Sequence, residues 1–248
     1  MFISYLAFML AFLFIGTVFT SIISGVIGMG GGVLLLSILS FFLPYELLIP
    51  IHGLIQLISN FSRSFYLRKH IKWNFFIPFL IGAPFGVVLV YFVIKNITAP
   101  NFYYLLLALF ITYVVFKPKR MPSFILSSKQ WGVLGFFSAI QGSLIGATGP
   151  LIAPFYLRDD ISKEEVVATK AAQQIVTHAL KIPLFLSLSF SYIPHLEMIV
   201  LLSLAAVFGT FLGVKILGKV NEKTFKKVFK VMLIFAAARL YYKFWIGL

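Results

Sequence analysis

Eight long apolar stretches follow one another along this chain of 248 residues, and short polar or charged segments separate them. A transmembrane helix needs about 20 apolar residues to cross a hydrocarbon core of about 30 Å. Only 11% of the residues are charged, whereas soluble domains carry about 25%. The sequence therefore predicts an all-α polytopic membrane protein, with apolar stretches at residues 2–42, 47–66, 73–94, 102–116, 131–157, 166–190, 198–217 and 225–246.

The first four stretches match the last four. An offset of 118 residues places Gly28 on Gly146 and continues into the next stretch, where residues 52–63 meet residues 170–181. An offset of about 123 residues then aligns Gly86 with Gly209. Transporters commonly show such internal duplications. We therefore predict two homologous four-segment halves, each with one broken helical segment and three further helices, which together form one transmembrane domain: residues 1–120 and 121–248.

The basic residues favour opposite orientations for the two halves. If all eight stretches cross the membrane, Lys and Arg divide almost evenly between its two sides. If residues 131–157 are instead re-entrant, and Lys170 and Lys181 are set aside as intramembrane, all Lys and Arg except Lys95, Arg239 and Lys243 fall on one side. Short cytoplasmic loops concentrate Lys and Arg. The sequence thus predicts an inverted repeat with glycine-broken re-entrant helices, and its net charge of +14 does not require a nucleic acid partner.

Each half has a glycine-rich break in its first stretch. Because glycine in a helix interior costs about 1 kcal/mol relative to alanine, these segments predict turns inside the membrane. The N–H groups of a helix that begins there suit an anion. Glycines that allow close helix packing are the alternative, and residues 2–15 either add a crossing or lie along the interface. The predicted binding segments are Gly28, Met29, Gly30, Gly31 and Gly32, and Gly146, Ala147, Thr148, Gly149 and Pro150.

The stretch that follows each break has one polar face. Polar residues recur at positions i, i+4, i+7, i+8 and i+11 in both halves, which is one side of a helix. All seven acidic residues lie at segment ends, so cations, amides and imidazoles without a carboxylate predict an anionic ligand. Lys170 is the predicted counter-charge. The other predicted binding residues of these faces are His52, Gln56, Asn60, Gln174 and His178.

These polar residues also have structural interpretations. Long basic side chains such as Arg63 and Lys181 can extend to a membrane interface. Buried histidines can serve packing alone, and glutamines can join helices by hydrogen bonds. Ser24, Gln141 and Thr148 can cap backbone groups near the breaks. The binding interpretation is favoured because two matched breaks and two matched faces recur at one offset.

Other functional classes lack the residues they need. The sequence has no G-x-x-x-x-G-K-[ST] loop for ATP-driven transport, no H-E-x-x-H motif and no cysteine. It also offers no convincing pair of nucleophile and base. We therefore predict no cofactor, no metal site and no enzymatic activity. A cation transporter or channel, with or without proton coupling, and a membrane-embedded enzyme stay open as alternatives.

The break segments and the faces that follow them resemble the sulfite exporter TauE/SafE family of membrane proteins. The resemblance lies in SGVIGMGGGVLLL and IPIHGLIQLISNFSR, and again in GSLIGATGPLIAPFYLRDDISKEEVVATKAAQQIVTHALKIP. It implies a secondary transporter of sulfite, thiosulfate or an organosulfonate across a bacterial or archaeal cytoplasmic membrane. The implied partners are a small anionic substrate and the lipid bilayer, and a homo-oligomer is left open. Because Thr148 and Pro150 stand where the first half has Gly30 and Gly32, the two breaks are expected to bind unequally.

Overall fold

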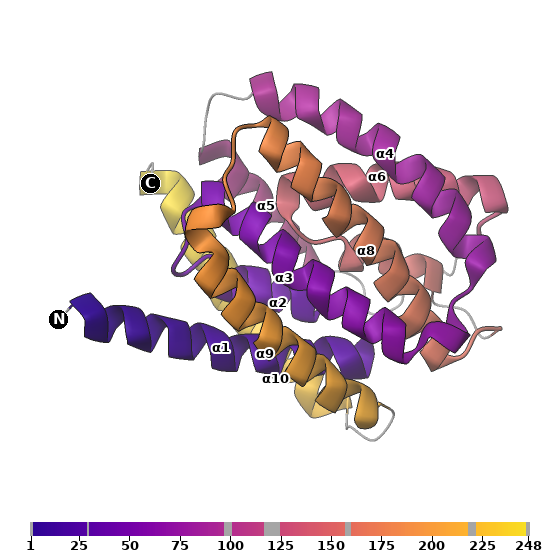
Figure 1. Ribbon diagram of the computed structural model, residues 1–248, viewed down its shortest axis with the longest axis horizontal. Helices are drawn as coiled ribbons and strands as arrows, with labels where there is room; N and C mark the ends of the chain where they lie inside the picture. The colour runs from indigo at the N-terminus through magenta and orange to yellow at the C-terminus, as the bar shows by residue number, and fades with distance from the viewer. Residues whose placement is uncertain are drawn as a thin grey trace.

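The computed structural model describes residues 2–28, 30–96, 101–116, 125–156, 160–217 and 222–246. Within these ranges the chain is all helical (Figure 1), which confirms the predicted fold class. The helices follow the predicted apolar stretches to within a few residues at each end. They are α1 (Phe2–Ile27), α2 (Gly31–Leu39), α3 (Tyr45–Tyr66), α4 (Trp73–Asn96), α5 (Asn101–Phe116), α6 (Ser128–Ile145), α7 (Gly149–Ile152), α8 (Lys163–Ser187), α9 (Leu196–Lys215) and α10 (Glu222–Ile246), with short 3-10 turns η1 (Arg68–His70), η2 (Ala153–Tyr156) and η3 (Ile193–His195).

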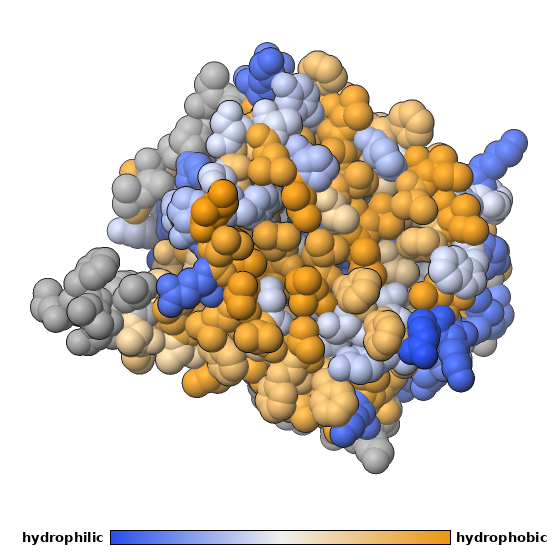
Figure 2. Space-filling model, in the orientation of Figure 1, coloured by the Kyte–Doolittle hydropathy of each residue, from blue (hydrophilic) through white to orange (hydrophobic). Residues whose placement is uncertain are grey.

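Three segments of the described chain are long and apolar enough to cross a membrane, namely Ala7–Val26, Trp73–Asn96 and Ile193–Lys215. Helix α5 is also apolar over Phe102–Phe116 but is shorter than these segments. Helices α3 and α8 also have membrane length, but polar side chains lower their hydropathy, and most of those side chains are buried. Figure 2 shows apolar residues over most of the visible face, with the hydrophilic residues gathered at its edges. This surface fits a protein that is surrounded by lipid.

Both glycine-rich segments interrupt a helix, as predicted. Helix α1 ends at Ile27, and Gly28 and Gly30 then adopt φ angles of 70° and 92°. Helix α6 ends at Ile145, and Gly146 follows with φ of 95°. Such left-handed angles are accessible to glycine at little cost. Helix α1 is continuous over 26 residues, so residues 2–15 form no separate crossing or interfacial helix, and its N-terminal end extends beyond its neighbours (Figure 1).

Each broken segment returns to the end of the molecule from which it starts. In the second half, the rings of Trp131 near the start of α6 and Tyr156 at the end of η2 are 5.3 Å apart. In the first half, the rings of Phe12 in α1 and Phe42 beyond α2 are 5.6 Å apart. The chain therefore makes two hairpins, and whether they are re-entrant in a membrane stays a prediction.

The two halves pack through matching, reciprocal contacts. A side chain on Gly86 of α4 would overlap the carbonyl oxygen of Phe136 in α6, and one on Gly209 of α9 would overlap that of Val18 in α1. The offsets that relate the halves turn one contact into the other, since Phe136 lies 118 residues after Val18 and Gly209 lies 123 after Gly86. Each broken helix thus packs on the third helix of the other half, which supports the predicted duplication.

The two hairpins begin at opposite ends of α8. Helices α6 and α4 run in parallel, because Gly132 and Phe136 contact Gly82 and Gly86 in the same order. The start of α4 lies at the N-terminal end of α8, where the backbone N–H of Lys72 donates to Thr169. Helices α1 and α9 are parallel in the same way, and α9 begins where α8 has ended. This arrangement fits an inverted repeat, whose orientation across a bilayer stays a prediction.

Two of the three basic residues that did not fit the predicted one-sided distribution of Lys and Arg have a structural role. Arg239 of α10 donates to the carbonyl oxygens of Ser40 and Phe41, at 3.3 and 2.8 Å, and Lys243 donates to that of Ser40 at 3.3 Å. These carbonyls follow the C-terminus of α2, where the helix dipole favours positive charge. Arg239 and Lys243 therefore stabilise a helix end, which gives them a structural role on the side that the sequence predicts to carry few cations.

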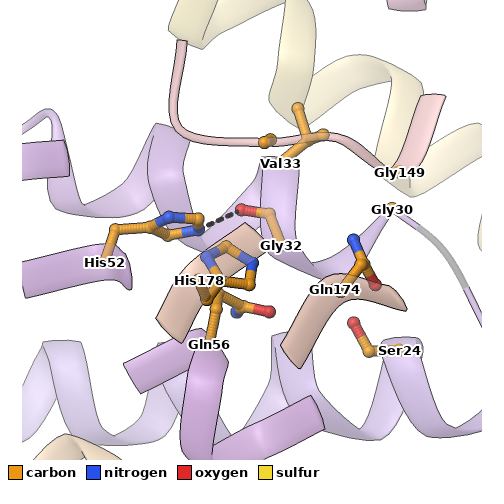
Figure 3. Close-up of a pocket in the computed structure, with 10 residues that line it drawn as sticks. Ser24, Gly30, Gly32, Val33, His52, Gln56, Gly149, Gln174 and His178 are labelled. Atoms are coloured by element: carbon orange, nitrogen blue, oxygen red, sulfur yellow. Dashed lines mark hydrogen bonds between the residues drawn. The ribbon is translucent and has the colours of Figure 1, made fainter. Parts of the chain in front are cut away.

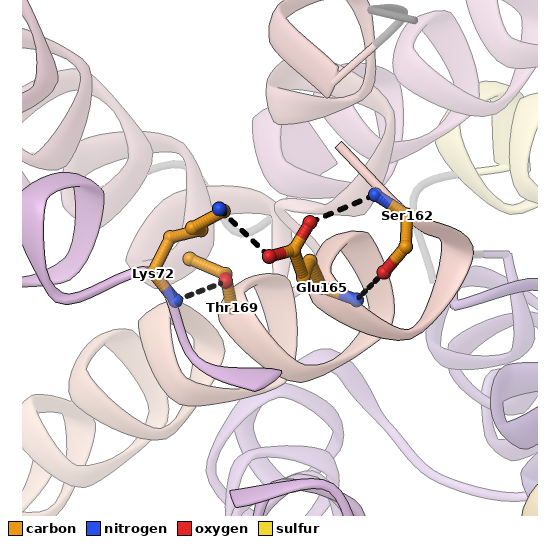
Figure 4. A network of polar contacts seen from close by, with 4 residues as sticks. All are labelled: Lys72, Ser162, Glu165 and Thr169. Carbon is orange, nitrogen blue, oxygen red and sulfur yellow. Dashed lines mark hydrogen bonds and ion pairs between the residues drawn. The ribbon is translucent and has the colours of Figure 1, made fainter. Parts of the chain in front are cut away.

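A polar network joins the corner between α3 and α4 to the start of α8 (Figure 4). Lys72 pairs with Glu165 at 2.7 Å. Ser162 and Glu165 form a capping box, in which the N–H of Ser162 donates to the Glu165 carboxylate at 2.8 Å and the N–H of Glu165 donates to the Ser162 hydroxyl at 3.2 Å. This network ties the first half to the second outside the apolar segments.

We expect Gly86→Ala and Gly209→Ala to destabilise the protein by similar amounts, about 1–3 kcal/mol each, because either methyl group would force a backbone carbonyl away. The measurement is the thermal unfolding midpoint of each variant in detergent. Gly16→Ala is the matched control, since its methyl group would meet only the side chain of Ile38, at 3.3 Å. A neutral effect at one of the two positions would contradict the equivalence of the two interfaces.

Acidification should weaken the junction at Glu165. The hydrogen bonds from Lys72 and then from Ser162 hold the pKa of Glu165 below its usual range. Its contribution to stability is therefore present above the unfolded-state pKa of about 4.3 and is lost as the pH falls through the lower folded-state pKa. Glu165→Gln, which preserves the capping box, should be less stable than wild type at neutral pH, with the difference vanishing in acid. Glu164→Gln, in the same helical turn, is the control and should show no such convergence.

Candidate functional site

A small cavity lies where the two breaks approach one another beside α3 and α8 (Figure 3). It is lined by 10 residues, which come from both breaks and both polar faces. Two of them, Ser24 and Val33, were not among the predicted binding residues. The other lining residues are Gly30, Gly32, His52, Gln56, Ala147, Gly149, Gln174 and His178.

Two histidines lie side by side at this cavity, His52 on α3 and His178 on α8. Their ring centroids are 5.9 Å apart. His52 Nε2 lies 2.8 Å from the carbonyl oxygen of Gly32, and because a carbonyl oxygen only accepts, Nε2 carries the hydrogen. The Nδ1 atom of each ring is buried and has no hydrogen-bond partner among the described residues. Both rings therefore have hydrogen-bonding capacity that the surrounding protein does not meet.

Amide groups and the two breaks form the rest of the lining. Gln174 donates through Nε2 to the hydroxyl of Thr148 at 3.3 Å, so one face residue holds the second break. Gln56 lies against the first break, where a Cβ on Gly32 would be 3.3 Å from its Oε1 atom. The breaks themselves meet, since a Cβ on Gly149 would lie 4.0 Å from the backbone nitrogen of Gly30.

Lys181 supplies a buried positive charge at the second break. Its side chain is 1% exposed, and its ammonium donates to the carbonyl oxygen of Gly146 at 2.8 Å. Its stem packs against Gly53, the neighbour of His52, with a distance of 3.1 Å from Lys181 Cδ to a Cβ built on that glycine. Lys181 therefore does not extend to a membrane interface, which was the structural alternative for this residue.

Arg63, the residue that corresponds to Lys181 in the first half, is buried as well. Its side chain is 1% exposed. The guanidinium donates to Asn60 Oδ1 at 3.1 Å and to Ser59 Oγ at 3.3 Å, and Asn60 donates in turn to the carbonyl oxygen of Gln56 at 2.7 Å. The predicted binding residue Asn60 thus belongs to the surroundings of Arg63 and does not line the cavity.

Lys170 lies outside the cavity lining. It is fully buried, and its Nζ atom is 5.8 Å from the ring centre of Tyr156 on η2. The structure therefore places the predicted counter-charge beside η2, whereas Lys181, which is likewise outside the lining, binds the carbonyl of Gly146 next to the lining residue Ala147. The sequence pattern included both residues in the polar face, but spacing alone could not show which of them contacts a break.

Several glycines of the breaks serve packing, as the alternative interpretation suggested. Gly28 lies against Val167 of α8 and Gly146 against Ile49 of α3, two positions that are 118 residues apart. Gly31 packs on the carbonyl oxygen of Thr20. Of the remaining predicted residues, Met29 and the side chain of Pro150 lie outside the described residues.

The two helices that follow the breaks differ in length. Helix α2 has nine residues, and its N-terminus lies at the cavity, because Gly30, Gly32 and Val33 line it. The free N–H groups and the positive dipole end of a helix lie at its N-terminus. Helix α7 has four residues before the chain tightens into η2, which is too short for an appreciable dipole. The expectation of two unequal breaks agrees with this difference.

The lining offers hydrogen-bond donors and no carboxylate. Amides, a hydroxyl group, imidazoles and the N–H groups at the start of α2 surround it, and a buried ammonium lies beside it. These groups can bind an oxyanion, and the lining lacks the carboxylates that Ca²⁺ and Mg²⁺ sites use. The free volume of the cavity is about that of one water molecule in the described conformation. A larger ligand therefore needs the breaks or the side chains to move apart.

The fold and the cavity define a helical membrane protein whose polar site lies at the junction of two broken helices. The family model Sulfite exporter TauE/SafE matches residues 13–240, and the chain belongs to this family. It is accordingly a membrane transporter of sulfite or a related anion, which agrees with the prediction that it is not an enzyme. Searches of curated proteins and of solved structures gave no match.

Two glycines of the second break should separate stability from ligand binding. Gly146→Ala should destabilise the protein by about 1–2 kcal/mol, because alanine is strained in left-handed geometry. Gly149→Ala should leave the unfolding midpoint nearly unchanged, since its methyl group would be 3.7 Å from Gln174, yet it narrows the cavity. Thermal unfolding with and without sulfite measures both effects, and full stabilisation of Gly149→Ala by sulfite would place the ligand elsewhere.

Proposed function

We propose that this chain is a secondary transporter that moves a small sulfur oxyanion, such as sulfite, thiosulfate or an organosulfonate, across the cell membrane as a multi-pass protein. The observation that carries this proposal is the carboxylate-free cavity between the two helix breaks, beside the buried ammonium of Lys181. Family membership supports transport of sulfite or a related anion. The cavity is the proposed place where that anion is held.

Lys181, rather than Lys170, is the proposed principal counter-charge. In the described conformation the Lys181 ammonium is bound to the carbonyl oxygen of Gly146, at the C-terminus of α6, where the helix dipole is negative. An ammonium has three N–H donors, so it can bind an oxyanion while it keeps or exchanges this contact. The N–H groups of α2 and the amide groups of Gln56 and Gln174 complete the proposed site.

The packing of the halves indicates which helices would move together in an alternating-access cycle. The close contacts at Gly86 and Gly209 join α4 to α6 and α1 to α9, and each pair contains one helix from each half. The two sequence halves therefore cannot separate without breaking these interfaces. We propose instead that α1 with α9, and α4 with α6, move as two bodies around the crossing of α3 and α8. Such rocking of symmetry-related elements around a central site is common in transporters with inverted repeats.

The test is a transport assay in liposomes containing the purified protein, with labelled sulfite, thiosulfate and sulfoacetate as substrates and phosphate and taurine as competitors. Wild type should transport at least one sulfur anion, and Lys181→Met should bind it about 10- to 100-fold more weakly, because a hydrogen bond from a charged group contributes about 1.5–3 kcal/mol. Lys181→Arg retains the charge and should lose less.

Lys170→Met is the matched comparison, because it removes an equally buried lysine from the same helix. Its loss of affinity should be smaller than that of Lys181→Met. The reverse order would restore Lys170 as the counter-charge. Stabilisation of the wild type by sodium or potassium alone, with no response to any anion, would overturn the anion proposal in favour of a cation transporter.

A further inference from the structure

Arg63 is a buried cation outside the cavity lining whose charge no carboxylate balances among the described residues. Its guanidinium is bound only by neutral oxygens, those of Asn60 and Ser59, in the described part of the chain. Its Nε atom is buried without a hydrogen-bond partner there. The ion pair in Figure 4 joins Lys72 to Glu165 and does not involve Arg63.

Burial of such a group is costly unless something compensates it. Removing a charge from water is unfavourable even after the protein relaxes, and a buried donor without a partner adds to that cost. Its neutral partners do not balance the charge, and one of them, Ser59, is also hydrogen-bonded to Thr210 of α9 at 3.0 Å. An anion that binds Arg63 for part of the transport cycle would account for both the charge and the unmet donor.

The repeat places Arg63 opposite Lys181. Helices α3 and α8 run antiparallel, because the His52 ring lies beside His178 while the chain just beyond α3 contacts Thr169 near the start of α8. Gln56 and Gln174, which are 118 residues apart, both line the cavity. Lys181 and Arg63 each follow their glutamine by seven residues, about 10 Å along a helix. The two cations therefore lie on opposite sides of the glutamine pair.

We infer that Arg63, with Asn60 and Ser59, forms a second anion-binding station, and that a sulfur oxyanion passes between it and the Lys181 station along the crossing of α3 and α8. This inference rests on the proposed function. The planar guanidinium suits bidentate binding of two oxygens of a sulfite or sulfonate group. Because the two stations lie on opposite sides of the glutamine pair, both can be occupied at saturating anion, and each state of an alternating-access cycle has its own counter-charge. Lys170 is fully buried and shares the polar face of α8 with Lys181.

The first measurement is the number of thiosulfate and sulfite ions that each purified protein binds, by equilibrium dialysis with labelled anion. Wild type should bind about two ions, and Lys181→Met and Arg63→Gln should each bind about one. Arg63→Lys retains the charge without the planar fork, so it should keep the second ion with weaker affinity. Lys69→Gln, at an exposed position in η1, is the control for a general loss of positive charge and should bind as wild type does.

The second measurement is transport by the same variants. Arg63→Gln should retain the ion that depends on Lys181 but transport at least about 10-fold more slowly, as expected when a step worth about 1.4 kcal/mol is lost, and Arg63→Lys should recover much of the rate. A purely structural role for Arg63 predicts instead that the thermal midpoint falls and that both ions are lost together.

The outcomes separate this inference from the proposed function. If no sulfur anion binds to wild type, the proposed function fails and the second station fails with it. If wild type binds one ion that Lys181→Met loses, and Arg63→Gln binds and transports normally, the second station alone is overturned. If Arg63→Gln does not fold, the stoichiometry of wild type and of the charge-preserving Arg63→Lys still decides, because a single ion in both would contradict the inference.

Discussion

The whole structure depends on satisfying backbone polar groups that two helix breaks expose inside an apolar protein. A lost backbone hydrogen bond cannot be replaced by water in such surroundings, so each freed group needs a partner from the protein. At the second break Lys181 binds the carbonyl of Gly146 and Gln141 donates to that of Ala147 at 3.2 Å. At the first break His52 binds the carbonyl of Gly32. The polar faces of α3 and α8 are therefore needed for the fold before any ligand is considered.

This double use explains why the polar residues recur at one offset. Helices α3 and α8 each pass the break of the other half, as the contacts of Gly28 with Val167 and of Gly146 with Ile49 show. Each helix also contacts the break of its own half through its polar face, since His52 binds the carbonyl of Gly32 and Lys181 binds that of Gly146. Because the break and the polar face belong to the same four-segment unit, duplication of that unit copies the freed backbone groups together with their hydrogen-bond partners. The cavity is the space that remains where the two sets meet.

Much of this arrangement could be predicted from the sequence because it follows from local patterns. Hydropathy located the helices, and glycine runs located both breaks. Helical spacing on α3 and α8 identified four of the ten cavity-lining residues, and the glycine-rich breaks identified four more. The positive-inside rule led to the prediction of a re-entrant segment, which stays untested, and it could not foresee that Arg239 and Lys243 cap α2.

The partner of each buried cation could not be predicted in the same way. Lys170 and Lys181 share a helix face, and their distances to the break depend on how α8 crosses α3, which no spacing within one helix encodes. The single-turn length of α7 was equally hidden, because residues 149–156 are apolar enough to suggest a longer helix. The tertiary structure determines both the partners of these lysines and the length of α7, and together they decide where positive charge lies near the breaks.

The unequal breaks bear on how an inverted repeat can bind a ligand that has no matching symmetry. In the first half, a nine-residue helix follows the break and supplies a positive dipole end. In the second half, a four-residue helix supplies almost none, and there Lys181 provides the positive charge directly. Arg63, its counterpart, is left without a break to bind in the described chain, which frees its charge for another purpose. In the proposed mechanism, divergence of the two halves gives a symmetric scaffold two different positive ends, between which the anion is passed.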